Sequence, residues 1–303
     1  MAPETTLPSI AKQTWLEPLE EGLQKGLAEA FKSDALRGKP VENALHGVWL
    51  GHPLHPALVG IPLGAWTVAF VLDLVEEATG ERHLRRGADL AVAVGLAGAA
   101  GSAVTGLTDW KDVQGPPRRT GMVHALLNIT ATALYVASAV QRKRRNRGAG
   151  RALAYAGFGL SMTASWLGGH LVFSDQIGVE HKAAAEAPSD FVPVARLTDL
   201  SEGKPHRVTY QDYPMVLVRE GERVFALAEI CSHLGGPLSE GTVEGECIRC
   251  PWHGSLFRLE DGEVVESPAT RPQSAFEARI HGDQIELRLR SNVIEATETK
   301  AKD

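Results

Sequence analysis

Four side chains in the C-terminal half have the types and spacing of metal ligands. Cys231 and His233 are separated by one residue, and Cys250 and His253 are separated by two. Glycine and proline surround both pairs, in 231-CSHLGGPL-238 and 250-CPWHG-254, and this composition predicts two projecting loops. Two thiolates and two imidazoles suit either a zinc ion or a mixed-ligand [2Fe–2S] centre, and the spacing alone does not decide between them.

The third cysteine, Cys247, offers a competing interpretation. It precedes Cys250 with two residues between them, which is a spacing typical of zinc sites and of redox dithiols. The segment 246-ECIRC-250 has the character of a β-strand, in which positions three apart point to opposite faces. We therefore interpret Cys247 as a small buried apolar residue and not as a ligand.

The loops must be positioned by a small β domain. Apolar residues alternate in 215-MVLVREGERVFAL-227 and in 276-FEARIHGDQIELRL-289, and each segment is interrupted by a turn-like EGE or HGD. This pattern predicts an all-β antiparallel sandwich or barrel over residues 191–290. Residues 175–190 are polar and rich in alanine and are predicted to form a linker, and residues 291–303 a polar tail.

The two loops and the domain around them resemble the Rieske [2Fe–2S] family. The resemblance implies that Cys231 and Cys250 bind one iron as thiolates. It also implies that His233 and His253 bind the other iron through neutral nitrogens, with their outer nitrogens near the surface. Imidazole ligands raise the reduction potential, and their titration couples electron transfer to pH. The implied function is one-electron transfer to a redox partner protein.

The loops depart from the Rieske proteins of quinol-oxidising complexes at several positions. The two further cysteines of those proteins, which form a disulfide, correspond to Gly236 and Trp252 here. Of the two hydroxyl donors near their cluster, Ser255 remains, and Phe257 stands at the other position. Ser255, Gly235 and Trp252 are expected to surround the cluster. We predict a potential below that of the respiratory proteins and closer to that of Rieske ferredoxins.

Two other function classes are disfavoured by length and charge. A Rieske oxygenase needs a mononuclear iron site in a large C-terminal domain, and only 50 residues follow His253. The net charge is −6, and no basic stripe with interleaved aromatic residues is present, so a nucleic-acid partner is not expected.

The N-terminal half carries four long apolar segments with the length of a membrane span. They predict an all-α four-helix transmembrane bundle over residues 43–174, for which a buried soluble bundle is the alternative. Abundant glycine and alanine suit close helix packing in lipid. The predicted spans are Ala57–Val75, Leu90–Thr108, Gly121–Gln141 and Ala152–Ser174. This half also resembles an uncharacterised bacterial family of four-helix membrane proteins over residues 45–175, in its HPLHP, GLTDW and helix histidines.

Basic residues predict how the bundle is inserted. The loops after the first and third spans contain Arg82, Arg85 and Arg86, and then six basic residues within 141–151. By the positive-inside rule these loops face the cytoplasm of a bacterium, so the N-terminus and everything after Ser174 face outward. The pair Arg144–Arg145 is either a solvated basic loop or an internal twin-arginine export signal, since the N-terminus carries no signal peptide.

Four histidines are predicted to meet near the outward leaflet: His52, His55, His124 and His170. Titratable groups inside a membrane mark functional sites by default, and facing imidazoles in a bundle can bind haem b or another metal. Asn128 lies one turn after His124 and is expected to orient its ring. The alternatives are a structural role for these histidines, or a proton or quinone site.

Residues 1–42 are polar and contain one amphipathic pattern. Apolar residues recur at helical spacing, so we predict a helix that either caps the membrane domain or lies on the lipid surface. They are Leu16, Leu19, Leu23, Leu27 and Phe31. The sequence as a whole predicts a membrane-bound electron-transfer protein that uses a quinone or haem site in its own membrane domain. The alternative is a tethered ferredoxin that serves a separate oxygenase or reductase.

Overall fold

A computed structural model describes residues 7, 10, 12–32, 39–179, 181, 183 and 185–290. The predicted polar tail, residues 291–303, lies outside the described residues, as do parts of the N-terminal segment and of the linker. The chain divides into two compact units. One is helical and comprises Met1–Gly47 and Pro53–Val179, and the other is mainly β and comprises Val48–His52 and Glu180–Asp303.

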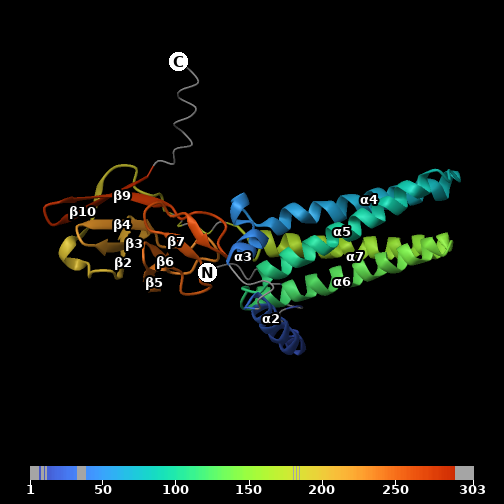
Figure 1. Cartoon of the computed structure of the whole chain (residues 1–303), viewed down its shortest axis with the longest axis horizontal. Helices are drawn as coiled ribbons and strands as arrows, with labels where there is room; N and C mark the ends of the chain where they lie inside the picture. The colour runs from blue at the N-terminus through green and yellow to red at the C-terminus, as the bar shows by residue number, and fades with distance from the viewer. Residues whose placement is uncertain are drawn as a thin grey trace, which may run out of the picture. The chain divides into compact units, whose positions relative to one another are not determined.

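Four long helices build the helical unit (Figure 1). They are α4 (Leu54–Thr79), α5 (Leu84–Trp110), α6 (Pro116–Lys143) and α7 (Arg147–Phe173). Short turns join α4 to α5 and α6 to α7, so each pair forms an antiparallel hairpin. The helix α4 packs on α5 and α7, and α6 packs on the same two neighbours. The helices α4 and α6 therefore face each other across the diagonal of the bundle.

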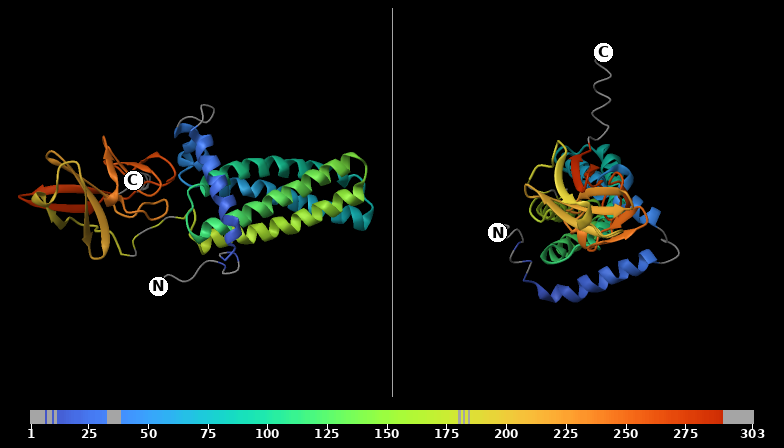
Figure 2. Two further views of the ribbon diagram at one scale, coloured as in Figure 1. Left: turned by 90° about the horizontal axis from the view of Figure 1, so that it is seen from below. Right: turned by 90° about the vertical axis from the view of Figure 1, so that its left-hand side faces the viewer.

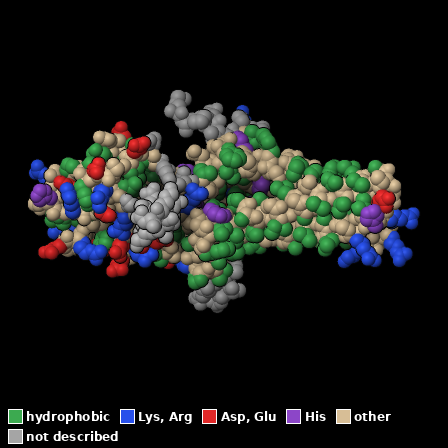
Figure 3. Space-filling view, turned by 90° about the horizontal axis from the view of Figure 1, so that it is seen from above, with side chains coloured by type: hydrophobic (Ala, Val, Ile, Leu, Met, Phe, Trp, Pro, Cys, Tyr) green, Lys and Arg blue, Asp and Glu red, His purple; other side chains and the backbone are tan. Residues whose placement is uncertain are grey.

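Three of the long helices, α4, α5 and α6, are long and apolar enough to cross a membrane by length and composition. Three of the four predicted spans therefore correspond to a helix that is long and apolar enough to cross a membrane. The fourth segment does form a helix, α7, but it is not among those apolar enough to span, because glycine, serine and threonine replace larger apolar residues along it. Spanning by α7 stays a prediction. Lys and Arg gather at one end of this unit, and the middle of its surface is apolar (Figure 3).

The two hairpins repeat one another. Buried positions on α4 recur on α6 at an offset of 69 residues, as in Pro62/Ala131, Trp66/Tyr135 and Ala69/Ser138. Buried positions on α5 recur on α7 at an offset of 62 residues, as in Ala88/Gly150, Val92/Ala154, Gly95/Gly157, Ser102/Ala164 and Thr105/Leu167. The bundle therefore has an approximate two-fold relation between its hairpins.

Short N-terminal elements precede the bundle: η1 (Thr14–Leu16), α2 (Glu17–Lys32) and α3 (Lys39–His46). The predicted amphipathic helix is present as α2, which lies across the ends of the long helices (Figure 2). It is held there by buried Glu20, which accepts hydrogen bonds from Arg118 at 3.0 Å and Arg119 at 3.2 Å. The predicted cap on the next domain is thus present, and Trp15, Leu19 and Leu23 are exposed.

The β unit contains two antiparallel sheets. The larger has the order β1-β10-β9-β4-β3-β2. Its strands are β1 (Val192–Arg196), β2 (Pro205–Tyr210), β3 (Tyr213–Glu220), β4 (Arg223–Ala228), β9 (Ala275–His281) and β10 (Gln284–Leu289). The smaller, β5-β6-β7-β8, is made of β5 (Thr242–Glu244), β6 (Cys247–Arg249), β7 (Leu256–Arg258) and β8 (Val264–Glu266). Both predicted hairpins are confirmed as β3–β4 and β9–β10.

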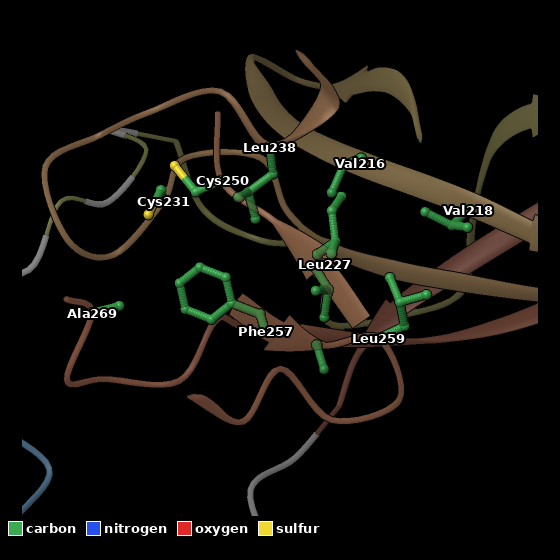
Figure 4. Close-up of a cluster of buried hydrophobic side chains, with 11 residues drawn as sticks. Val216, Val218, Leu227, Cys231, Leu238, Cys250, Phe257, Leu259 and Ala269 are labelled. Atoms are coloured by element: carbon green, nitrogen blue, oxygen red, sulfur yellow. The ribbon is translucent and has the colours of Figure 1, made fainter. Parts of the chain in front are cut away.

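The core next to the smaller sheet supports the two predicted loops. Val216, Leu227, Ile248 and Phe257 are buried in one cluster that also includes Cys231 and Cys250, among others. Figure 4 shows both cysteines at one end of this cluster. The sulfur atoms therefore lie on an apolar floor and not at the tips of mobile loops.

Candidate metal centre

The two loops are built in the same way. Each begins at a buried cysteine and closes four residues later at a glycine whose N–H donates to the carbonyl of that cysteine. The N···O distances are 2.9 Å for Gly235 to Cys231 and 3.1 Å for Gly254 to Cys250. Both glycines have positive φ, 80° and 78°, a conformation that side chains with a Cβ rarely adopt. These turns direct the residues between cysteine and glycine toward the opposite loop.

Both sulfur atoms receive backbone hydrogen bonds and are hydrogen-bonded to one another. The pKa of Cys250 is lowered to about 7, first because the Cys231 thiol donates a hydrogen bond to it, with further help from the N–H groups of Trp252 and His253. The pKa of Cys231 is raised well above its ordinary value by the same hydrogen bond and by burial, although backbone groups at His233 and Leu234 oppose this rise. The site therefore provides fixed dipoles that favour negative charge on sulfur.

The histidines form a second pair. The ring centroids of His233 and His253 are 5.1 Å apart and the rings are perpendicular. Both side chains are half-buried. Within the described residues, no three His, Cys, Asp or Glu side chains converge on one metal position. Two thiols and two imidazoles held as two pairs fit a mixed-ligand [2Fe–2S] centre, in which each iron takes two protein ligands.

The residues around the cysteines fit a compact centre without a disulfide. A Cβ at Gly236 would lie 2.8 Å from Cys250 Sγ and 3.1 Å from Trp252 Cγ, so a side chain at this position would collide. Ser255 is fully buried, and its Oγ accepts the N–H of Ala269 at 3.0 Å, which leaves its hydroxyl proton available to donate. Phe257 is fully buried and offers no donor.

Cys247 is only partly as predicted. It lies in β6, but it is half-buried and not buried, because the buried face of this strand is that of Ile248 and Cys247 lies on the opposite face with Arg249. It stands apart from the pair formed by Cys231 and Cys250.

One supporting residue was not predicted from the sequence. The buried Gln273 side chain accepts the Ser232 N–H at 2.9 Å and donates to the carbonyl oxygens of Ala228 (2.9 Å) and Ile230 (2.8 Å). It thereby ties the first loop to the end of β4. Gln273 lies in an irregular segment before β9, and no motif in the sequence marks it.

The four predicted membrane histidines do not form one cluster in the described part of the chain. His55 and His124 each bind a backbone carbonyl on the neighbouring helix through Nδ1, and they lie close enough to interact electrostatically. His170 lies near buried Asp175, with 3.8 Å between Nε2 and Oδ1. His52 is exposed and falls in the segment grouped with the β unit. Asn128 does contact the ring of His124, with 3.1 Å between Nδ2 and Nε2.

A small antiparallel β domain with paired cysteine and histidine loops defines a class of iron–sulfur electron carriers, and comparison with known proteins agrees. Residues 190–279 match the Rieske [2Fe-2S] domain, and residues 51–181 match a predicted membrane protein domain of the DUF2231 family. The chain belongs to the Rieske family through the first of these domains and carries the second fused before it. A Rieske domain implies a [2Fe–2S] cluster and electron transport.

Individual relatives cover only the β domain. The anthranilate 1,2-dioxygenase ferredoxin subunit of Burkholderia cepacia is 30% identical over 33% of this chain and 94% of its own length. The cytochrome b6-f complex iron-sulfur subunit of Chlorobaculum thiosulfatiphilum is 27% identical over 32% of this chain and 52% of its own length. Among solved structures, the ferredoxin of carbazole 1,9a-dioxygenase from Nocardioides aromaticivorans is 29% identical and covers 34% of this chain and 100% of its own, with a TM-score of 0.32.

Proposed function

We propose that this protein is a membrane-bound one-electron carrier. Its Rieske head exchanges electrons with a redox partner or with a quinone or haem site in its own membrane domain. In this proposal Cys231 and Cys250 bind one iron and His233 and His253 bind the other. The membrane domain comprises residues 43–174 and the cluster domain residues 191–290.

The observation that carries the proposal is the pairing of the four side chains. Two sulfur atoms share a buried floor with backbone donors, and two perpendicular imidazoles lie apart from them as a second pair. When bound, the cluster supplies reversible one-electron chemistry. The chain orients the ligands, excludes water from the sulfurs, and holds or releases the protons of the outer imidazole nitrogens.

A tethered ferredoxin is the second candidate. Several relatives of the head are ferredoxin components, such as that of anthranilate 1,2-dioxygenase, and the loops carry Gly236 and Trp252 in place of the two disulfide cysteines. In that case the membrane domain is only an anchor, and the head serves a separate oxygenase or reductase. The presence or absence of a second redox centre in the membrane domain discriminates between the two.

We further propose that the membrane domain is multi-pass and that the head lies on the outer face of a bacterial cytoplasmic membrane. The basic loop residues lie at the ends where α4 meets α5 and α6 meets α7, and α7 ends on the side opposite to them. By the positive-inside rule the chain after α7 is then outside, provided that α7 spans.

The test is iron analysis with reduced-minus-oxidised absorption and EPR spectra of the full chain, purified in detergent. We expect two irons for each chain and the broad bleaching of a mixed-ligand cluster. Cys250→Ser should abolish the signal, whereas Cys247→Ser, a matched control at a half-buried cysteine, should keep it. Stoichiometric zinc without iron, or loss of the signal in Cys247→Ser, would contradict the proposed ligands.

A further inference from the structure

We propose that His55 and His124 are the paired axial ligands of a haem in the core of the helical bundle. This assignment rests on the membrane electron-transfer function proposed above and identifies its second centre. The repeat between the two hairpins places His55 and His124 at equivalent positions.

Each hairpin carries the same stripe of three functional positions. On α4, His55, Trp66 and Asp73 are eleven and seven residues apart, and on α6 the same steps join His124, Tyr135 and Arg142. Eleven residues are about three helical turns and eighteen are five, so each stripe lies on one helix face. The offset between the stripes is the same 69 residues that relates the buried positions of α4 and α6.

Two of the three layers are joined directly across the diagonal. Trp66 stacks on Tyr135 with ring centroids 4.0 Å apart and an interplanar angle of 11°. Asp73 forms a buried ion pair with Arg142. Both stripes therefore face the common axis at these two layers, and the same spacing places His55 and His124 on the same two helix faces.

The imidazole layer is the one layer of the three held only within its own hairpins. His55 Nδ1 lies 2.9 Å from the carbonyl oxygen of Ser102 on α5, and His124 Nδ1 lies 2.8 Å from that of Ala164 on α7. A carbonyl can only accept, so Nδ1 carries the proton and Nε2 keeps its lone pair. This is the arrangement in which proteins hold histidines that ligate metal.

Glycines set the position of both rings. A Cβ at Gly106 would lie 2.8 Å from His55 Cε1, and a Cβ at Gly168 would lie 3.1 Å from His124 Cε1. These glycines correspond at the 62-residue offset, so in both hairpins a glycine of the neighbouring helix leaves room for the histidine ring. The Asn128 amide lies 3.1 Å from His124 Nε2, which fits an unprotonated Nε2, and iron bound at Nε2 would take the place of this contact.

The number of protein ligands favours haem over a bare metal ion. No third His, Cys, Asp or Glu joins the pair within the described residues, and a bare ion needs more protein ligands than two. A porphyrin supplies four nitrogens and leaves the two axial positions to imidazoles.

The experiment uses the full chain, expressed with a haem precursor, purified in detergent and analysed for haem by its absorption and low-spin EPR spectra. We expect equimolar haem with two imidazole ligands, and loss of the bound haem in His55→Ala and in His124→Ala. The controls His83→Ala, an exposed histidine at the opposite end, and His170→Ala should keep the haem. His124→Gly should regain a low-spin spectrum when free imidazole is added.

The EPR signal of the [2Fe–2S] cluster separates the possible failures. Absence of both signals would contradict the function proposed above. An intact cluster without haem, haem that survives in both His55→Ala and His124→Ala, or a porphyrin-free metal at this site would each overturn the present assignment. If free imidazole fails to restore the low-spin spectrum of His124→Gly while the cluster stays intact, His124 is not a haem ligand.

Discussion

At the residue scale, the cluster site contains some residues that belong to a sequence motif and others that only the structure identifies. Cys231, His233, Cys250 and His253 could be proposed as ligands from the sequence because their types and spacing match the two loops of the Rieske family. Gln273 could not, since a buried glutamine that bonds three backbone groups leaves no pattern in the sequence. The burial of Cys247 was predicted wrongly because strand alternation does not reveal which of the two faces is buried, and in β6 the buried face is that of Ile248.

The buried hydroxyl of Ser255 should tune the potential of the cluster. A hydrogen bond to sulfur stabilises the reduced cluster, and about 1 kcal/mol corresponds to about 40 mV for one electron. Ser255→Ala should therefore lower the midpoint potential by about this amount in an EPR-monitored redox titration. Ser255→Thr keeps the hydroxyl and serves as the control, and an unchanged midpoint in Ser255→Ala would exclude a donor role.

The fully buried Phe257 permits the opposite change. Phe257→Tyr introduces a hydroxyl near the sulfur atoms, on a ring that lies in the same buried cluster as both cysteines. We expect the midpoint potential to rise by about 40 mV if the hydroxyl donates to the cluster or its ligand. A fall in potential in the same titration, with the cluster intact, would contradict the expected direction.

At the element scale, the β hairpins and apolar helices follow from periodicity, but the repeat between the helical hairpins does not. Its equivalent residues differ in kind, as in Trp66 with Tyr135 and Asp73 with Arg142, so their identities hide the relation. Their common burial and spacing reveal it. Ion pairs between α2, α3 and the bundle were likewise absent from the sequence pattern, because they join residues far apart in the chain.

Glu20 should hold α2 against the bundle. It is fully buried between Arg118 and Arg119, and its removal leaves both guanidinium groups without this carboxylate. Glu20→Gln should cost about 3–5 kcal/mol at this contact and expose α2 to trypsin at Lys25. Glu21→Gln, at an exposed neighbouring position, is the matched control. Equal cleavage rates in the two variants would show that the buried pair does not anchor the helix.

Lys111 and Glu42 should make the contact of α3 with the bundle pH-dependent. Burial raises the pKa of Glu42, but the hydrogen bond and charge of Lys111, 2.8 Å away, offset this and lower it overall. A lowered carboxyl pKa stabilises the folded state above the ordinary value of about 4.3, and this stability is lost as the pH falls through the folded pKa. Glu42→Gln should therefore lower the melting temperature at pH 7 and have little effect near pH 3. Equal losses at both pH values would contradict an ionic origin.

At the scale of the whole molecule, one chain joins a Rieske domain to a predicted membrane domain. The folded bundle pairs much of its basic charge internally: Arg142 and Arg147 bind Asp73 and Asp89, and Arg151 binds Glu76. The exposed residues Arg144 and Arg145 are therefore the ones that can be changed without dismantling the folded bundle.

Changing Arg144 and Arg145 tests which of two mechanisms would place the Rieske domain on the outer face. If loop charge alone sets the orientation, Arg144→Lys with Arg145→Lys should keep the head outside, because the charge is unchanged, whereas replacing both with Gln should reduce the outward fraction. If a twin-arginine signal is needed to move a folded head, the lysine pair should fail as well. An alkaline phosphatase or a green fluorescent protein fused after Asp303 reports the outer or the cytoplasmic side. Fluorescence from the unmodified chain, with no phosphatase activity, would place the head in the cytoplasm and contradict the proposed topology.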